Sequence, residues 1–596
     1  MDNNYWSNIL SRRLNRRRAL AGTVAAGGAA AFLAACGGGS GTTEDTGPKD
    51  SSGLLSKPQD TTNKAVKGGI WLSSRTDDPV TLDVTLNNSS LSWLDMLHVY
   101  QHLTKAGIRS NQPDAFEGDA AASWEFSPDG LQATYKLRPG VKWDARAPTN
   151  GRVMDSGDVK YSFDKFAGAS PYRAELFNKI EAAAPIESYS TPDNQTFVIK
   201  LAFPYGSLVE MTGYLNYLYL VPKEAETFDL RGDMRGSGPF RLSKYTPSVA
   251  LEYERNPDYY LKDRPFLDGV RRAIVPEYAT GLAQFKNKAI WSLTGNSLRQ
   301  EDVLQTKKEH PEMVMQQIGE VGVSSLQSTA YLAFSQRPDS PLKDVRLRRA
   351  ASMLIDRELF ITSRNNTEMF TSVGLPAETW WNGHLPTKSP NWVDPRDKAF
   401  GENGKYFQFN PEEALKLIKA TGQNTVNLPY FYQIRSGTPS RDNEIFAAML
   451  QEGNGFKLDA KTLEYTNEWR EVCQRSAGEG YLGFCQNNAG AFNEDGWLVA
   501  KYTPQGKYSA SYVPIPGVTD EVLRIRKEID PVKRSALIKA LAQGKLASEM
   551  YDLPIPGRAP TYNLSWPWFK NYGSFDTGGE SARVFNEYWY DASAKT

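Results

Sequence analysis

Cysteine and histidine are scarce in this chain of 596 residues, which contains three cysteines and four histidines. No cluster of histidine, cysteine and carboxylate residues offers a coordination sphere, so the sequence predicts no metal site. A Ser/His/Asp hydrolase is poorly supported as well, because no G-x-S-x-G motif occurs. We therefore expect no catalytic residue, no metal and no cofactor.

Net charge is absent too, because 69 basic side chains balance 69 acidic ones. A neutral chain without long runs of like charge creates no field that attracts nucleic acid or an anionic membrane surface. No nucleic-acid partner is therefore expected. Hydrophobic residues make up 40% of the chain, which is too apolar for disorder, and its length predicts two or three domains.

Three short matches to motifs of catalytic or nucleotide-binding sites lie in unsuitable contexts. Gly478 to Gly483 fits G-x-G-x-x-G, but a helix-like run precedes it and a strand-like run follows, the reverse of a dinucleotide-binding loop. Ser340 to Lys343 fits S-x-x-K, but its proline indicates a turn. His98 and His102 have the spacing of zinc ligands on a helix, yet Val99 stands where a metalloprotease needs glutamate. We interpret both histidines as partly buried helix residues.

The first 35 residues have the pattern of an export signal. Arginines at 12–13 and 16–18 precede a weakly apolar stretch, Ala19 to Ala35, and resemble a twin-arginine signal. The stretch ends in Leu33-Ala34-Ala35-Cys36-Gly37, which resembles the lipobox of bacterial lipoproteins. A transmembrane helix is disfavoured, because about 17 weakly apolar residues fall short of the ~20 that span a bilayer. We expect lipidation of Cys36 and a membrane anchor.

Residues 36–65 are expected to form the lipidated N-terminus and a flexible tether. They are rich in Gly, Ser, Thr, Asp and Lys and offer few apolar groups to bury. A coil of about 30 residues would reach on the order of 30 Å.

Cys473 and Cys485 remain if Cys36 carries lipid, and an exported protein meets conditions that permit disulfides. Their spacing would close a loop of about a dozen residues. Two buried free thiols are equally compatible with the sequence, because the sequence does not tell whether the Cβ atoms meet.

Strand and helix patterns are mixed along the mature chain. Apolar residues alternate at 131–137 and at 197–201, the period of half-buried strands. Asn410-Pro411 supplies a cap and a first helical turn. A further helix follows Asp344, and Arg348 and its neighbouring arginines are expected on its solvated faces. The fold class is therefore α/β or α+β.

Several separated segments of the mature chain form an ordered set. They are Gly68-Gly69, Asp77 to Asp83, Ala122 to Glu125, Ser127 to Gly130, Leu137 to Trp143, Asp158 to Phe163, Gly236 to Phe240, Glu254 to Tyr260, Arg264 to Asp268, Asp344 to Arg357, and the helix from Asn410. Single pieces are ordinary turn or strand chemistry, but this does not explain their order. In this order they resemble the large solute-binding proteins of ABC importers in the oligopeptide/dipeptide/nickel class, family 5.

This resemblance implies two α/β lobes that are joined by crossover strands and enclose a ligand, plus an extra domain packed on the first lobe. Lobe I would comprise residues 66–108, 228–308 and 553–596. The extra domain would comprise 109–227, and lobe II 309–552. Hinge closure around the ligand would then produce the form that a permease recognises.

The resemblance also implies where a ligand would bind. In oligopeptide binders of this family, a tryptophan on a helix lines the cleft. An acidic residue shortly after a strand that ends in Trp-Cys or a similar pair binds the ammonium group of the peptide. Glu468-Trp469-Arg470 resembles that helix and Tyr481 to Asn488 that strand. Amides stand where the acid is expected, so an ordinary oligopeptide is disfavoured unless Glu494 or Asp495 supplies the charge.

Amides and an aromatic residue between Gln486 and Trp497 suit a polar ligand such as a sugar, although a surface loop has the same composition. Trp469 also fits a core stripe with Val472 and Cys473 equally well. The expected ligand-binding residues are Trp469, Phe484, Asn487, Asn488, Asp495 and Trp497.

The sequence thus predicts an extracytoplasmic substrate-binding lipoprotein that captures a peptide-like or polar oligomeric solute and delivers it to an ABC importer. Its expected partners are the solute, the permease subunits and, through the lipid anchor, the membrane in the periplasm or at the outer cell surface. We expect a monomer that is not an enzyme. An exported hydrolase stays open, because glycosidase carboxylate pairs leave no local sequence mark. A ligand-sensing lipoprotein is the other alternative.

Overall fold

The computed structural model describes most of the chain after the export signal. The described residues are 50–595 except 58, 87–89, 109–115, 294–297, 319–328, 336, 388, 436–437, 440, 476–480, 505, 507, 510–513 and 576–582. Cys36 and the first half of the G-x-G-x-x-G match, 478–480, therefore lie outside the described residues. Within those residues, no helix has the length and apolar character of a membrane span.

Lobe I is built on a four-stranded sheet whose β1 and β10 are parallel and whose other pairs are antiparallel. In sheet order the strands are β1 (Ile70–Arg75), β10 (Gly269–Ile274), β9 (Ala250–Arg255) and β8 (Phe240–Thr246). Its helices are α2 (Ser90–Val99), α6 (Tyr278–Lys286) and α7 (Gln300–Glu309). Because α2 ends at Val99, His102 lies beyond the helix on which the sequence placed it. Trp71, Trp566 and Phe585 share one buried core, so both ends of the chain complete this lobe.

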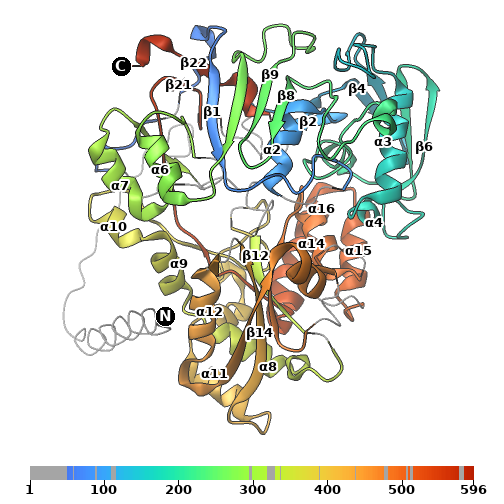
Figure 1. Ribbon diagram of the computed structural model, residues 1–596. Coiled ribbons are helices and arrows are strands. Elements are labelled where there is room, and N and C mark those ends of the chain that lie inside the picture. Colours follow the sequence, from blue (N-terminus) through green and yellow to red (C-terminus); the bar gives the residue numbers. More distant parts are fainter. Residues whose placement is uncertain are drawn as a thin grey trace, which may run out of the picture.

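The extra domain lies beside lobe I, at the upper right of Figure 1. Its antiparallel strands, in sheet order, are β4 (Ala121–Phe126), β5 (Gln132–Leu137), β7 (Thr196–Leu201) and β6 (Ile186–Asp193). The strands predicted at 131–137 and 197–201 are thus confirmed, and they pair with each other. Helix α3 (Ser156–Ala169) starts at a capping box of Asp155 and Asp158.

Lobe II forms the lower half of the molecule around a six-stranded sheet (Figure 1). In order its strands are β15 (Thr438–Pro439), β14 (Val426–Arg435), β17 (Phe484–Ala489), β12 (Thr329–Phe334) and β18 (Asp552–Pro554), and β16 (Phe456–Glu464) also pairs with β14. The helices around it include α8 (Val345–Met353), α11 (Pro411–Lys419), α12 (Arg441–Leu450), α14 (Glu494–Tyr502), α15 (Thr519–Lys527) and α16 (Pro531–Leu541).

The predicted helix starts in lobe II are confirmed by their caps. The Asn410 side chain accepts a hydrogen bond from the Glu413 amide, and the Asp344 side chain accepts one from the Arg346 amide. The solvated position expected for Arg348 is wrong. Its side chain is buried, and its guanidinium donates to the carbonyl oxygens of Glu549 and Leu342 at 2.8 and 3.0 Å.

Two strands carry the chain between the lobes side by side. β11 (Val314–Ile318) precedes β12 of lobe II and pairs antiparallel with β20 (Thr561–Ser565), which brings the chain back. Met315 lies opposite Leu564 in this pair. The chain therefore leaves lobe I and returns to it at the same place, as the predicted crossover requires.

A third connection contains α9 (Arg357–Asn365), α10 (Thr367–Thr371) and β13 (Trp380–Trp381). Phe360 packs in the lobe II core, whereas Phe370 and Leu375 pack in the lobe I core. The rings of Phe370 and Tyr562 have centroids 4.5 Å apart. The expected division, with all of 309–552 in lobe II, therefore differs from the structure here, because this segment reaches back onto lobe I.

Residues 50–57 and 59–62, expected to belong to a flexible tether, lie against lobe I. The Ser51 amide donates to the Gly374 carbonyl at 3.0 Å, and the Ser56 amide donates to the Met315 carbonyl at 2.8 Å. The composition could not predict this contact, because the hydrogen bonds are donated by main-chain amides, which every such sequence has. The rest of the predicted tether, 36–49, lies outside the described part of the chain.

Candidate functional site

Of the predicted ligand-binding residues, Asn487 and Asn488 lie where β17 leaves the lobe II sheet. Thr329, at the start of β12, pairs with Ala489, at the end of β17. Because the chain enters β12 from lobe I, the end of β17 lies on the side of lobe II where the lobes are connected. Helix α14 begins shortly afterwards, at Glu494. We call residues 484–497 the β17–α14 segment.

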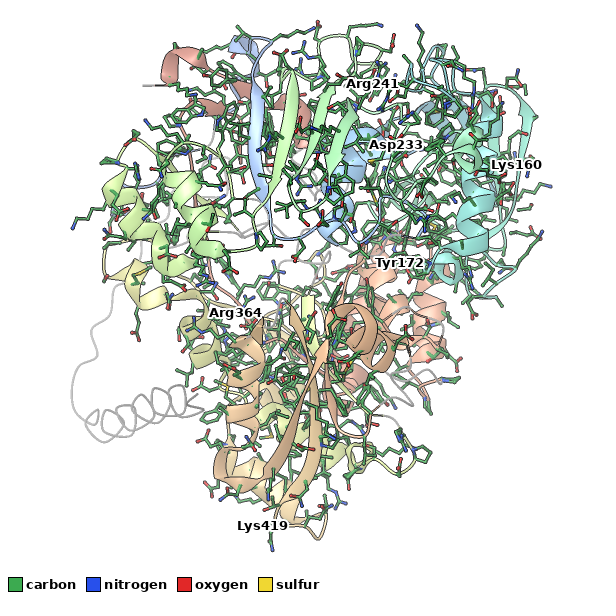
Figure 2. The ribbon with its side chains drawn as sticks, in the orientation of Figure 1. Lys160, Tyr172, Asp233, Arg241, Arg364 and Lys419 are labelled. Carbon is green, nitrogen blue, oxygen red and sulfur yellow. A yellow bond between two sulfur atoms is a disulfide. The ribbon has the colours of Figure 1, made fainter. Side chains whose placement is uncertain are left out.

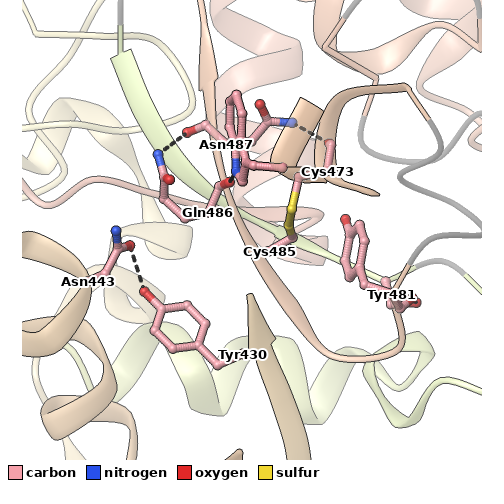
Figure 3. Close-up of a disulfide and its surroundings, with 9 residues drawn as sticks. Tyr430, Asn443, Cys473, Tyr481, Cys485, Gln486 and Asn487 are labelled. Atoms are coloured by element: carbon pink, nitrogen blue, oxygen red, sulfur yellow. Dashed lines mark hydrogen bonds between the residues drawn. A yellow bond between two sulfur atoms is a disulfide. The ribbon is translucent and has the colours of Figure 1, made fainter. Parts of the chain in front are cut away.

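Helix η8 (Tyr465–Arg475) is bound to β17 by a covalent bond and two hydrogen bonds (Figure 3). Cys473 and Cys485 form a disulfide with Cα atoms 6.0 Å apart, within the range that a disulfide requires. The Trp469 indole donates to the Gln486 carbonyl at 2.7 Å, and the Asn487 side chain donates to the Cys473 carbonyl at 2.9 Å. Trp469 and Asn487 therefore have fixed positions beside the end of β17.

Both side chains are enclosed in this conformation. Trp469 is 1% exposed and Asn487 is 0% exposed. The Trp469 ring stacks on Tyr465 with centroids 5.4 Å apart. Such burial fits a core stripe and also the wall of a closed cleft, so their role in ligand binding stays a prediction. The Asn488 side chain lies outside the described set.

Phe484 and Trp497 are packed inside lobe II. The Phe484 ring lies 5.5 Å from Phe334 and 5.7 Å from Phe456, between ring centroids, in the lobe II core. Core packing alone accounts for this position. The Trp497 indole donates to the His384 carbonyl at 2.9 Å, and its ring centroid is 4.9 Å from the Lys501 ammonium group.

The two acids that could replace the missing counter-charge already accept hydrogen bonds from the protein. A Glu494 carboxylate oxygen accepts from the Asn391 amide at 2.7 Å. Asp495 Oδ2 accepts from the Tyr205 hydroxyl of the extra domain at 2.7 Å, while its Oδ1 is buried with no partner among the described residues. Burial, reinforced by the Asp495 charge, raises the pKa of Tyr205 well above its usual value. Asp495 thus faces the extra domain.

The extra domain contacts the same stretch of lobe II through further side chains. Phe492 packs against Tyr214 and Tyr217, with ring centroids 5.6 and 5.8 Å away. The Asn493 side chain, which caps α14, donates to a Glu210 carboxylate oxygen. Sequence reasoning missed Tyr205 and Glu210, because their partners lie 290 and 283 residues away and no local pattern marks them.

Helix α15 adds a second set of contacts between these two parts. The buried Arg526 guanidinium donates to the Glu175 carbonyl at 2.8 Å and lies 5.2 Å from the centroid of the Tyr205 ring. The Tyr172 and Tyr508 hydroxyl groups are 3.4 Å apart, and Figure 2 places Tyr172 at this boundary. We call all these contacts the extra-domain contact.

A buried ion pair connects α14 to the returning chain. The Lys501 ammonium nitrogen is 3.0 Å from Asp552 Oδ2, and the Tyr502 hydroxyl donates to the same oxygen at 2.7 Å. Burial lowers the pKa of Lys501, although Asp552 opposes this effect. Burial would raise the pKa of Asp552, but Lys501 and His384 hold it below its usual value. The first turn of α14 therefore contacts the extra domain, and its last turn contacts β18.

Comparison with known proteins gives a consistent family and fold. The model of bacterial extracellular solute-binding proteins, family 5 Middle, matches residues 115–509. The dipeptide-binding protein DppE of Bacillus subtilis is 22% identical over 413 residues, which are 66% of this chain and 69% of that protein.

Two solved structures illustrate the likeness of fold. The periplasmic binding protein DppA of Helicobacter pylori, in complex with the peptide STSA, aligns with a TM-score of 0.70 and 19% identity over 89% of this chain and 99% of that one. AgaA of A. tumefaciens R10, in complex with agropinic acid, aligns with a TM-score of 0.68 and 18% identity over 88% of this chain and 99% of that one.

The predicted two-lobed α/β fold with an extra domain is therefore confirmed. The family match covers more than half of the chain and includes the sheet of the extra domain, strand β11 and the β17–α14 segment. The chain belongs to family 5 of the bacterial extracellular solute-binding proteins.

Proposed function

We propose that this chain is the substrate-binding component of an ABC importer and captures a peptide-like or polar oligomeric solute between lobe I and lobe II. The observation that carries the proposal is the position of the β17–α14 segment, at the connected side of lobe II, in a chain of this family. The chain itself is not an enzyme in this proposal, and its partners are a solute and the permease subunits.

The solute is held by hydrogen bonds rather than by an obligatory ion pair at its end. Asn487 and Asn488 are the amide residues at the end of β17; the Asn487 side chain donates to the Cys473 carbonyl, and the neighbouring acids Glu494 and Asp495 are engaged by Asn391 and Tyr205. A free ammonium group would have to displace one of those contacts. The structures with STSA and with agropinic acid contain chemically different ligands, so the fold does not restrict the solute to peptides.

Closure supplies the mechanism of capture. Solute contacts both lobes only when they approach, so binding shifts the population toward the closed form. The extra-domain contact would form in the same movement, because Phe492, Asn493 and Asp495 belong to the β17–α14 segment. The permease would then recognise the closed form.

We also propose that Cys36 is lipidated after export by a twin-arginine route, so that the monomer is tethered to a membrane. The support is the sequence Leu33-Ala34-Ala35-Cys36-Gly37 and the arginines before it. Cys36→Ala should move the protein from the membrane fraction to the soluble fraction. A variant that still fractionates with membranes would exclude the anchor.

A thermal-shift screen tests the ligand proposal. Free peptides, terminally blocked peptides, oligosaccharides and opines are added to the protein, and any bound compound is analysed by mass spectrometry. Saturation at a hundred times Kd should stabilise the protein by ~2.7 kcal/mol. A compound recovered intact supports a binding protein. A compound recovered cleaved would favour the exported hydrolase, and exclusive binding of free-ammonium peptides would contradict the proposed recognition by amides.

A further inference from the structure

Residues 50–57 and 59–62, here called the strap, touch three separate parts of the chain. Ser51 donates from its amide and its hydroxyl to the Gly374 carbonyl at 3.0 and 3.1 Å. The Ser56 amide donates to the Met315 carbonyl at 2.8 Å. Thr61 donates from its amide and its hydroxyl to the Asn571 side-chain oxygen at 2.8 and 2.6 Å. The strap is therefore fixed at its start, its middle and its end.

Two of these partners belong to connections between the lobes, and the third follows such a connection in lobe I. Met315 lies in β11, through which the chain leaves lobe I. Gly374 follows α10, at the lobe I end of the segment that reaches back from lobe II. Asn571 follows β20 and β21 (Phe569–Lys570), in the chain that has returned. The strap thus bonds to β11, to the segment after α10 and to the chain beyond β20.

The local structure is adapted to this contact. Gly374 has φ +84°, and a Cβ atom there would lie 2.5 Å from Ser51 Oγ, so the position requires glycine. Leu54 and Leu55 pack against the lobe I core. The Trp589 indole donates to the Thr61 hydroxyl at 3.0 Å. A polar segment without a hydrophobic stripe is in this way held by specific bonds.

β11 is held from a second direction by the turn after β21. The Gln316 side chain donates to the Tyr572 carbonyl at 3.0 Å. Gly573 has φ +70°, and a Cβ atom there would lie 2.4 Å from Gln316 Oε1. With β20 paired along it and the strap bonded to Met315, β11 has little freedom to bend. β11 is therefore held along its length.

We propose that the strap braces the lobe I ends of the inter-lobe connections and thereby limits the opening of the lobes. Hinge motion depends on a few residues that change their backbone angles, and the strap keeps β11 out of that set. Release of the strap adds β11 and the segment around Gly374 to the hinge, so the open form becomes more populated. This inference rests on the lobe closure of the proposed function but not on the identity of the solute.

The decisive pair of variants is Ser56→Pro and Ser56→Ala in the full chain. Proline removes the amide that donates to Met315, whereas alanine keeps it. Spin labels on non-canonical amino acids at Val249 of lobe I and Lys419 of lobe II, both exposed, report the lobe separation without disturbing the cysteines. Without solute, Ser56→Pro should give a longer and broader distance distribution, and Ser56→Ala should match the parent. Identical distributions for all three proteins would overturn the brace.

Hydrogen exchange distinguishes the brace from general destabilisation. The amides of β11 should exchange about ten-fold faster in Ser56→Pro, and those of β5 in the extra domain should not change. Thr61→Val, which removes the hydroxyl bonded to Asn571 but keeps the amide, should give the same pattern with a smaller amplitude. Faster exchange in the strap alone, or equal acceleration of β5 in both variants, would contradict the proposal. Failure of the solute screen would leave these results unaffected.

Discussion

Lobe II meets the upper half of the molecule at two junctions that are built differently. At the crossover, β11 and β20 are continuous chain, paired from Val314 opposite Ser565 to Ile318 opposite Thr561. At the extra-domain contact, no chain crosses, and side chains such as Tyr205 and Asp495 meet across the boundary. The first junction cannot separate, because continuous chain crosses it. The second can separate, at the cost of exposing its aromatic rings, so opening is expected there and pivoting at the crossover.

Helix α14 lies between the extra-domain contact and the lobe II sheet. Asp495 in its first turn binds Tyr205, and Lys501 in its last turn binds Asp552 of β18, which pairs with Ala333 inside that sheet. The comparison can be tested by removing, in turn, this ion pair, the disulfide that supports β17, and the extra-domain contact.

Lys501→Met should have the largest effect. It leaves the buried Asp552 carboxylate without its cation and should cost ~3–5 kcal/mol of unfolding free energy. Urea denaturation at neutral pH measures the loss. Lys419→Met, at an exposed position of α11, is the matched control and should change little.

The pH dependence of this loss gives a second readout. In the parent, the lowered pKa of Asp552 contributes stability above its unfolded pKa of about 3.9, and this contribution is lost as pH falls below that value. In Lys501→Met, burial without a cation should raise the pKa of Asp552. Protonation of Asp552 as the pH falls should then remove the unpaired buried charge and its cost to stability. The stability difference should therefore shrink in acid. A constant difference would show that Lys501 acts through packing alone.

Removal of the disulfide should have an intermediate effect. Cys473→Ser with Cys485→Ser frees η8 from β17 and should lower stability by ~2–4 kcal/mol. Melting is measured with and without reductant. The parent should lose stability on reduction, whereas the double variant should be insensitive. A parent that melts identically under both conditions would mean that the disulfide does not fix this part of lobe II.

Tyr205→Phe should have the smallest effect on stability but the most specific one on closure. It removes the hydroxyl that donates to buried Asp495 and should disfavour the extra-domain contact by ~1–2 kcal/mol. Solute affinity should fall about ten-fold, since closure becomes less favourable. Tyr189→Phe, which loses a hydroxyl contact on the outer side of the extra domain, is the control. Equal solute affinities of both variants would show that this contact does not contribute to closure.

Local features of the fold were predictable because they depend on neighbouring residues. Alternation at 131–137 placed β5, and Asn410 placed the start of α11 with its cap. The order of the separated segments predicted the two lobes and the extra domain. These signals need only the strand period, capping chemistry and turn chemistry.

The partners of individual side chains were not predictable, because they lie far away in the sequence. Arg348 has the position of a surface residue in its helix, but in the structure it is buried and donates to the Glu549 carbonyl. Residues 50–62 have the composition of a coil, but β11 and Asn571 offer partners to their polar groups. For the same reason the pattern could not show that Asp495 faces Tyr205 rather than an open cleft.

Distances measured across both junctions in one protein test the account most directly. One label pair, Lys179 and Val532, spans the extra-domain contact, and another, Val373 and Glu444, lies on the crossover side, all at exposed positions. Without solute, the first pair should show a broad distribution that becomes short and narrow when a solute from the thermal-shift screen is added. The second pair should stay narrow throughout. Larger changes in the second pair, or none in either on binding, would contradict closure that pivots at the crossover.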